Sequence, residues 1–180
     1  MAGLEPLPTV MFSAEQIACR VRELARQISS DYDGVEELVM VGVLRGCYIF
    51  LADLSRALTV PRRIDFIAVS AYGLGTTPSE SLRLIMDVRS DLAGRHVLLV
   101  DDILDSGLTL YYLSHLLNAR NPASLRTCVF LRKPGRLQVD IVPDYLGFDI
   151  PDVWVVGYGL DCADRYRALP YIGQVDPELL

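Results

Sequence analysis

Three carboxylates stand close together in the stretch HVLLVDDILDSGLTL, which covers residues 96–110. Asp101 and Asp102 are adjacent, and Asp105 follows immediately before Ser106 and Gly107. Carboxylates at the end of an apolar strand can stabilise positive charge, bind a hard metal ion or exchange a proton. We therefore treat this stretch as the first candidate for a reactive site.

The residues after Asp105 have the composition of a phosphate-binding turn. Gly107 allows a tight backbone turn, and Ser106 and Thr109 add hydroxyl groups at the start of a helical pattern. The free amides and the dipole at a helix N-terminus favour an anion at that position. The residues alone leave a simpler alternative open, in which Ser or Thr only caps the helix.

Two acids after an apolar strand are also found in nucleotide hydrolases that carry a phosphate loop. That class needs the pattern G-x-x-x-x-G-K-[ST] elsewhere in the chain. The sequence contains no such pattern, so we set this class aside.

The elements that must position these residues follow from hydrophobic periodicity. Ser13 and Gln16 match a capping box that opens a helix with Ile17, Val21, Leu24 and Ile28 on one face. Apolar runs predict strands at 37–44, 63–70, 82–88, 96–100, 126–132 and 153–159. Further helices are predicted at 48–58 and 109–118, and residues 71–81 have the Gly, Pro, Ser and Thr content of a mobile loop. Alternating strands and helices predict an α/β fold, with a mostly parallel sheet covered on both faces.

Length and charge narrow the class of protein. The chain has 180 residues, a length that suggests one domain and leaves room for a small appended lobe. Its net charge of −6 argues against general binding to nucleic acid, although a local basic pocket for a small anion is compatible with it. The four cysteines show no C-x-x-C pair, and no run is apolar enough to span a membrane. We expect free thiols and a cytoplasmic protein without a signal peptide.

The stretch VLLVDDILDSGLT resembles the phosphoribosyl-diphosphate signature of the type I phosphoribosyltransferases. That signature is a hydrophobic strand, two acids, two apolar residues, and then Asp, Ser or Thr, Gly, any residue and Thr. The resemblance extends over about residues 15–173. Over this range the chain is similar to the hypoxanthine-guanine phosphoribosyltransferases. The stretches that carry it are VGVLRGCYIFLADLSR, VSAYG, LAGRHVLLVDDILDSGLTL, LRKPGR and DYLGFDIPDVWVVGYGLDCADRYRALPYIG.

The resemblance implies an α/β fold of a particular kind. It implies a Rossmann-like parallel sheet of about five strands flanked by helices, a flexible flap loop and a small hood lobe. The whole chain, 1–180, would form a single phosphoribosyltransferase domain. Its core would span about 35–150, and the N-terminal segment and about 151–180 would form the hood.

The resemblance also implies the reaction and the partners. The 5-phosphoribosyl group of phosphoribosyl diphosphate would pass to N9 of a 6-oxopurine, with release of pyrophosphate and with Mg²⁺ as cofactor. The product would be IMP or GMP, as in purine salvage. We expect no nucleic-acid or membrane partner, and a homodimer or homotetramer, which is typical of the family.

Residue by residue, the resemblance assigns the donor side of the site. Asp101 and Asp102 would hold the ribose hydroxyls, and Asp105 would face purine N7 as the general acid or base. The 5′-phosphate would be bound by Ser106, Gly107, Leu108 and Thr109. Pyrophosphate would be bound by Leu44, Arg45, Gly46 and Arg167, with a strained, often cis peptide between Leu44 and Arg45. From the residues alone, a plain strand-to-helix turn is the better explanation of Leu44–Gly46, and only the resemblance reverses this.

The base side follows in the same way. Lys133 would donate to the 6-oxo group, the backbone of Val155 would read the base edge, and Trp154 would stack on the purine. Asp161 matches an aspartate linked to magnesium. Without the resemblance, Lys133 could be an exposed loop lysine, Trp154 a core residue and Arg167 a solvated charge.

The flap would involve Ser70 and Tyr72. Between them stands Ala71, so the flap has one hydroxyl group fewer than is usual in the family. Leu108 and Asp101 also depart from the most common family residues. Two rivals are a regulatory protein of this fold that senses nucleotides or binds RNA, and an enzyme for another base. The sequence does not separate hypoxanthine, guanine and xanthine.

Overall fold

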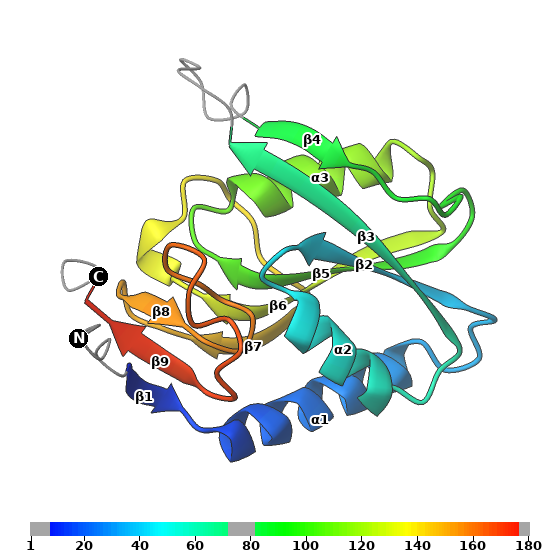
Figure 1. The fold of residues 1–180 in the computed structure, drawn as a ribbon. Helices are drawn as coiled ribbons and strands as arrows, with labels where there is room; N and C mark the ends of the chain where they lie inside the picture. Colours follow the sequence, from blue (N-terminus) through cyan, green and yellow to red (C-terminus); the bar gives the residue numbers. More distant parts are fainter. Residues whose placement is uncertain (1–7, 72–81, 177–180) are drawn as a thin grey trace.

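The computed structural model describes residues 8–71 and 82–176. Figure 1 shows the arrangement of the elements. The helices are α1 (Ala14–Asp31), α2 (Tyr48–Ala57), α3 (Leu108–Asn118) and the short 3₁₀ helix η2 (Pro134–Arg136). The strands are β1 (Thr9–Phe12), β2 (Leu38–Leu44), β3 (Arg62–Ala71), β4 (Leu82–Met86), β5 (His96–Leu104), β6 (Ser124–Arg132), β7 (Tyr145–Asp149), β8 (Trp154–Val156) and β9 (Ile172–Val175).

The main sheet has six strands in the order β4-β3-β2-β5-β6-β7. The five strands from β3 to β7 in this order are parallel, and β4 pairs antiparallel with β3 at the edge. The predicted α/β fold with a mostly parallel sheet is therefore confirmed. Its five parallel strands match the expected number, and β4 adds an antiparallel strand at the edge. The sequence analysis missed β7, because its five residues include Gly147 and Asp149 and show no apolar run.

Helices cover both faces of this sheet, as Figure 1 shows. Side chains of α1 and α2 pack on one face in a core with residues of β2, β5 and β6, such as Met40, Val100 and Phe130. Side chains of α3 pack on the other face with Val41, Leu99 and Val129. The central strands are buried on both sides, which explains why their sequences are continuously apolar rather than alternating.

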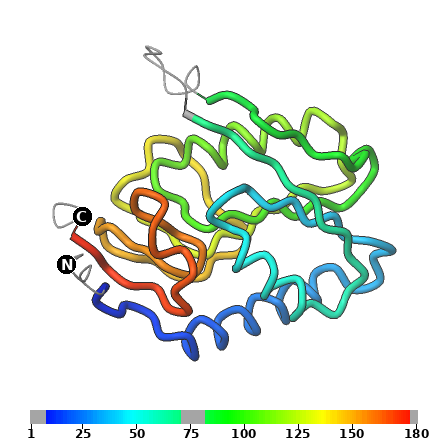
Figure 2. Tube along the Cα trace, viewed as in Figure 1, coloured from blue at the N-terminus to red at the C-terminus, as the bar shows by residue number. Residues whose placement is uncertain are grey.

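A second, smaller sheet joins the two ends of the described chain. Its order is β1-β9-β8, with antiparallel pairing throughout. Figure 2 shows the blue start and the red end of the trace side by side beside the main sheet. This sheet combines the two segments for which the small hood is predicted, and we use the name hood for it below. Strand β8 ends at Val156, earlier than predicted, because Gly157, Tyr158 and Gly159 all adopt positive φ angles.

The first helix begins as its sequence predicts. The Ser13 hydroxyl accepts from the Gln16 amide at 3.3 Å, and the Ser13 amide donates to Oε1 of Gln16 at 2.8 Å. This reciprocal capping box gives hydrogen-bond acceptors to two backbone N–H groups at the helix start. It fixes where α1 leaves the hood and enters the main domain.

Among the described helices, none is both long and apolar enough to cross a bilayer.

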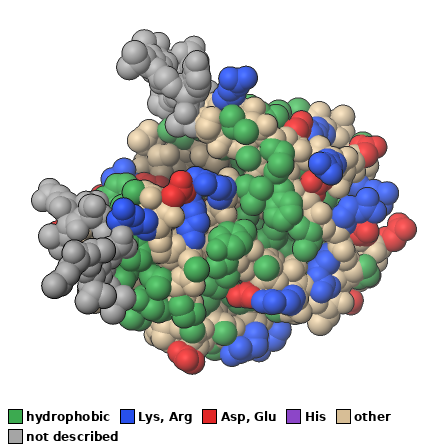
Figure 3. All heavy atoms as spheres, in the orientation of Figure 1, with side chains coloured by type: hydrophobic (Ala, Val, Ile, Leu, Met, Phe, Trp, Pro, Cys, Tyr) green, Lys and Arg blue, Asp and Glu red, His purple; other side chains and the backbone are tan. Residues whose placement is uncertain are grey.

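Hydrophobic side chains gather over β3 and α2 in the middle of the face in Figure 3, and basic and acidic side chains lie together near the hood. Exposed apolar residues in this part of the fold include Tyr48, Ile64 and Met86.

Candidate active site

The acid pair lies inside a strand rather than beyond its end. Strand β5 continues to Leu104, and Asp101 and Ile103 are still in register with Val129 and Leu131 of β6. The prediction that the strand stops at Val100 was therefore wrong. Pairing with β6 overrides the polar character of the two aspartates and holds them on a rigid element.

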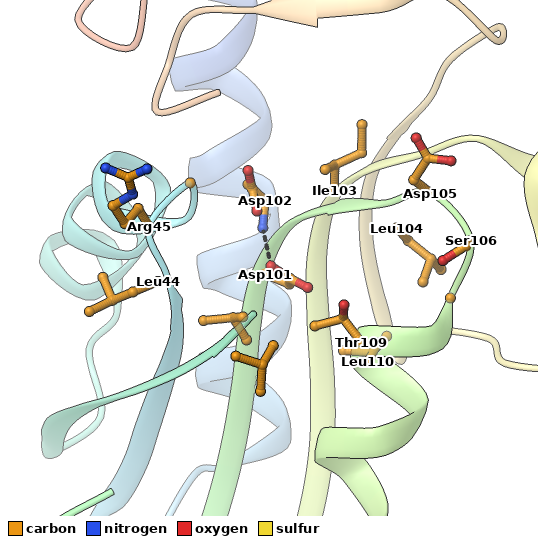
Figure 4. Close-up of a pocket in the computed structure, with 14 residues that line it drawn as sticks. Leu44, Arg45, Asp101, Asp102, Ile103, Leu104, Asp105, Ser106, Thr109 and Leu110 are labelled. Atoms are coloured by element: carbon orange, nitrogen blue, oxygen red, sulfur yellow. Dashed lines mark hydrogen bonds between the residues drawn. The ribbon is translucent and has the colours of Figure 1, made fainter. Parts of the chain in front are cut away.

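A cavity of about 300 Å³ opens at the carboxyl ends of β2 and β5. Figure 4 shows the side chains that line it, with Arg45 on one side and Ser106 and Thr109 on the other. The predicted residues that line this cavity are Leu44, Arg45, Gly46, Asp101, Asp102, Asp105, Ser106, Gly107 and Thr109. Leu108 belongs to the same turn but does not line the cavity. Two segments far apart in the sequence, 44–46 and 101–109, are thus brought together.

The two adjacent aspartates carry unfavourable electrostatics. Asp101 is only 6% exposed, and its Oδ1 accepts from the Asp102 amide at 3.0 Å. Burial raises the pKa of Asp101 well above its usual range, and the charge of Asp102 raises it further. Burial also raises the pKa of Asp102. Among the described residues, neither side chain forms a salt bridge, and the charge of Arg167 offsets only part of the rise in the pKa of Asp102.

Gly46 is required by the position of Asp102. A Cβ atom on Gly46 would lie 1.8 Å from Oδ2 of Asp102, a clear overlap. A Cβ on Gly159 would lie 2.0 Å from the Gly46 carbonyl oxygen, so the two loops are packed backbone to backbone. The peptide between Leu44 and Arg45 is cis, as the family resemblance implies, and it lies in the turn that links β2 to α2.

Helix α3 begins at the predicted turn. Gly107 is its N-cap at φ +85°, a left-handed conformation that side chains rarely adopt. The Ser106 hydroxyl is 3.4 Å from the Leu108 amide, too long for a strong cap. The simple capping alternative is therefore weak, and the start of α3 is directed at the cavity that Ser106 and Thr109 line.

A second cavity of about 270 Å³ adjoins the first. Asp102, Ile103 and Asp105 line both cavities, so these residues mark where the two meet. The second cavity is otherwise lined by Lys133, Arg136, Asp152, Trp154, Val155, Leu160 and Asp161. All four residues predicted for the base and the metal lie in it.

Four alternating charges form a closed ring at this junction. Asp105 accepts from Nζ of Lys133 at 3.2 Å and from Nε of Arg136 at 2.6 Å. Asp152 lies 3.6 Å from the Lys133 ammonium and 3.4 Å from the Arg136 guanidinium. Lys133 is only 7% exposed, so the reading of it as an exposed loop lysine is wrong.

Trp154 lines the second cavity and is 56% exposed, although it is the largest side chain in β8. The alternative that it is a core residue is therefore wrong. Val155 beside it is buried, as expected for a residue whose backbone rather than side chain faces a ligand. An exposed aromatic ring at a cavity wall offers a flat surface for stacking.

Arg167 and Asp161 form one cluster at the edge of the site. Nη2 of Arg167 pairs with Asp161 at 2.7 Å, and Nη1 donates to the Gly159 carbonyl at 2.8 Å. Arg167 does not line either cavity, and it is not the freely solvated charge of the alternative reading. Ser70 is half-buried in β3 opposite Arg83, while Tyr72 lies outside the described residues.

The structure adds three charged residues that the sequence analysis did not assign. Arg136 and Asp152 complete the ring around Asp105, and Asp164 pairs with Arg45 at 2.7 Å. Arg136 could have been noticed from its position three residues after Lys133. No sequence signal linked Asp152 or Asp164 to the site, because both depend on contacts between distant loops.

Known proteins resemble this chain over most of its length. Residues 11–163 match the phosphoribosyl transferase domain family. A hypoxanthine-guanine phosphoribosyltransferase of Dictyostelium discoideum is 46% identical, covering 94% of this chain and 96% of that protein. A hypoxanthine phosphoribosyltransferase of Salmonella typhimurium is also 46% identical, covering 92% and 94%. The crystal structure of a hypoxanthine-guanine phosphoribosyltransferase from Bacillus anthracis matches with a TM-score of 0.91 at 42% identity, over 95% of this chain and 100% of that one.

Proposed function

Because the chain belongs to the phosphoribosyltransferase family, with the hypoxanthine-guanine enzymes as relatives, we propose that it is a purine salvage enzyme. It transfers the 5-phosphoribosyl group of phosphoribosyl diphosphate to N9 of a 6-oxopurine and releases pyrophosphate. The bond between C1 of the ribose and the diphosphate oxygen breaks, and the bond between C1 and N9 forms. The acceptor is hypoxanthine, guanine or both.

One observation carries this proposal: two cavities with different chemistry meet at Asp102, Ile103 and Asp105. The first cavity offers acids and a helix N-terminus, which suit the ribose and phosphate of a donor. The second offers a flat aromatic ring and a buried ammonium group, which suit a base with an oxo group. A transfer reaction needs both substrates to meet at one wall, and these three residues provide it.

On the donor side, Ser106, Gly107, Leu108 and Thr109 hold the 5′-phosphate at the start of α3. Asp101 and Asp102 bind the ribose hydroxyls. As the diphosphate leaves, positive charge grows on the ribose, and these carboxylates stabilise it. The arginines at positions 45 and 167 and the backbone of 44–46 hold the departing diphosphate.

On the base side, Lys133 donates to the 6-oxo oxygen and Trp154 stacks on the ring. Asp105 takes the proton from N7 as N9 bonds to the ribose. Arg136 lies 2.6 Å from the Asp105 carboxylate. When Lys133 turns towards the oxo group, Arg136 therefore remains to orient the Asp105 carboxylate. The backbone of Val155 reads the far edge of the ring, and Ser70 and Tyr72 contribute to closure over the site.

The acid residues fit a magnesium cofactor. Among the described residues, no group of three or more possible ligands forms a metal cage. Mg²⁺ commonly uses one or two carboxylates together with substrate phosphates. Asp101 and Asp102 would supply such carboxylates beside the diphosphate. When bound, Mg²⁺ neutralises the diphosphate. Asp161, which pairs with Arg167, is the further residue proposed to be linked to the metal.

We also propose an assembly of two or four copies. Exposed apolar side chains on α2, β3 and β4, such as Tyr48, Ile64 and Met86, offer a contact surface. Light scattering coupled to size exclusion measures the assembly directly. A single domain spanning 1–180, a core over about 35–150, a hood that includes about 151–180 and a cytoplasmic location stay predictions.

The decisive experiment is a steady-state assay with phosphoribosyl diphosphate, Mg²⁺ and four separate bases: hypoxanthine, guanine, xanthine and adenine. We expect turnover with hypoxanthine, guanine or both. Turnover should vanish in excess EDTA and return with added Mg²⁺. Absence of transfer to every 6-oxopurine, or full turnover in excess EDTA, would contradict the proposal.

A further inference from the structure

Asp164 bridges two cations that the proposed function assigns to pyrophosphate. Its Oδ1 lies 2.7 Å from Nη2 of Arg45 and 3.0 Å from Nη2 of Arg167. One carboxylate oxygen thus joins the loop after β2 to the loop after β8. The Asp164 carboxylate therefore lies between two guanidinium groups, as an anionic ligand would.

Oδ1 of Asp164 occupies the position between the two guanidinium groups that an oxygen of the diphosphate would take. Guanidinium groups bind carboxylate and phosphate oxygens through the same donors and with the same geometry. Arg45 and Asp164 are both well exposed, with side-chain exposures of 69% and 61%. Either side chain can therefore turn to solvent at little cost when a stronger anion arrives.

Arg167 does not need Asp164 to stay in position. Its Nη2 also pairs with Asp161 at 2.7 Å, and its Nη1 donates to the Gly159 carbonyl at 2.8 Å. These two contacts hold the guanidinium from the side of the hood. Removal of the Asp164 charge would free a donor of Arg167 without releasing the side chain.

We propose that Asp164 is an internal counter-ion that competes with diphosphate for Arg45 and Arg167. It lowers the affinity for the donor substrate and speeds the release of pyrophosphate. The inference rests on the proposed function of this site and goes beyond it, because it assigns a rate- and affinity-setting role to a residue that neither binds substrate nor takes part in the chemistry.

The variant Asp164→Asn isolates the charge. Asp164 has φ +63°, a conformation that Asn tolerates as well as Asp. Its backbone amide, which donates to Oδ2 of Asp161 at 2.8 Å, is unchanged by the substitution. Alanine at this position would add backbone strain and confuse the result.

The test is calorimetric titration of wild type and Asp164→Asn with inorganic pyrophosphate in Mg²⁺ buffer. We expect the variant to bind roughly two- to tenfold more tightly, the scale of an exposed ion pair that no longer competes. In kinetics, KM for phosphoribosyl diphosphate should fall by a similar factor while kcat stays level or falls. High salt should reduce the difference between the two proteins.

Asp87→Asn is the matched control, because Asp87 forms an exposed pair with Arg120 at 2.8 Å on another part of the surface. It changes the net charge equally and should leave pyrophosphate affinity unchanged. Equal or weaker binding by Asp164→Asn, or equal tightening by both variants, would overturn the inference while leaving transferase activity intact. A wild-type protein with neither pyrophosphate binding nor transfer would overturn the proposed function itself, and the inference with it.

Discussion

The two cavities that meet at Asp105 treat charge in opposite ways. In the first, Asp101 and Asp102 lie side by side near the end of β5 without a salt bridge to a described residue, and only the more distant charge of Arg167 offsets their repulsion. In the second, Lys133, Arg136, Asp105 and Asp152 balance one another in a closed ring. The first cavity therefore gains stability when a cationic or hydroxyl-bearing ligand arrives, whereas the second must exchange one internal partner for a ligand.

This difference teaches where selectivity can arise. A ligand that binds at the ring must offer Lys133 an acceptor, because Lys133 gives up its ion pairs with Asp105 and Asp152 when it turns towards the ligand. A ligand that enters the acid cavity only has to relieve repulsion, which many arrangements of hydroxyls and metal can do. Discrimination between bases should therefore come from the ring, and binding energy for the donor from the acids.

The largest effect should be on base choice. Lys133 has donors but no acceptor, so the amino group of adenine cannot satisfy it, and the wild type should prefer hypoxanthine or guanine over adenine by about 10⁴. Lys133→Met should remove most activity towards 6-oxopurines and shrink this gap. The measurement is kcat/KM for each base, and adenine turnover within about tenfold of hypoxanthine in the wild type would refute the role of Lys133.

Next in size is the loss of the proton acceptor. Asp105→Asn should lower kcat by about 10²–10⁴, the usual range for a single general acid or base. KM for phosphoribosyl diphosphate should move little, because Asp105 faces the base and not the ribose. Steady-state kinetics check both quantities. A variant with near-normal kcat would remove Asp105 from the mechanism.

A smaller loss should follow from opening the ring at Arg136. Arg136→Gln should lower kcat by roughly tenfold, because Asp105 would have no cation to orient it once Lys133 turns to the base. Arg136→Lys should recover part of the loss, since it restores a charge near the carboxylate. Arg120→Gln, which opens an exposed pair with Asp87, is the control and should leave kcat unchanged.

The smallest effect should be on stability, and it should have the opposite sign. Because the pKa of Asp101 is raised in the folded protein, its ionised form destabilises the fold above the ordinary pKa near 4. Asp101→Asn should therefore raise the free energy of unfolding at pH 7 by about 1–2 kcal/mol. The gain should shrink as the pH falls below the raised pKa and should be absent below about 4, and KM for the ribose donor should rise. Denaturant unfolding at several pH values measures it, and a destabilised variant at pH 7 would contradict the account.

Most of the fold could be predicted because apolar runs and the capping box are local signals. The sequence predicted six strands and three helices near their observed places, but not β1, β7 and β9, which are short and depend on partners far along the chain. In the site, the stretch 101–109 was recognisable because its residues are adjacent. Asp152 and Asp164 were not, because their contacts with Arg136 and Arg45 come from the packing of separate loops.

The exposed ring of Trp154 also gives this protein an optical property. It is the single tryptophan of the chain, and it lies at the wall of the second cavity with 56% of its surface open. Its fluorescence emission therefore comes from one known place. A purine stacked on the indole would exclude water from it and quench or blue-shift the emission, so binding of a base can be followed in real time without a label.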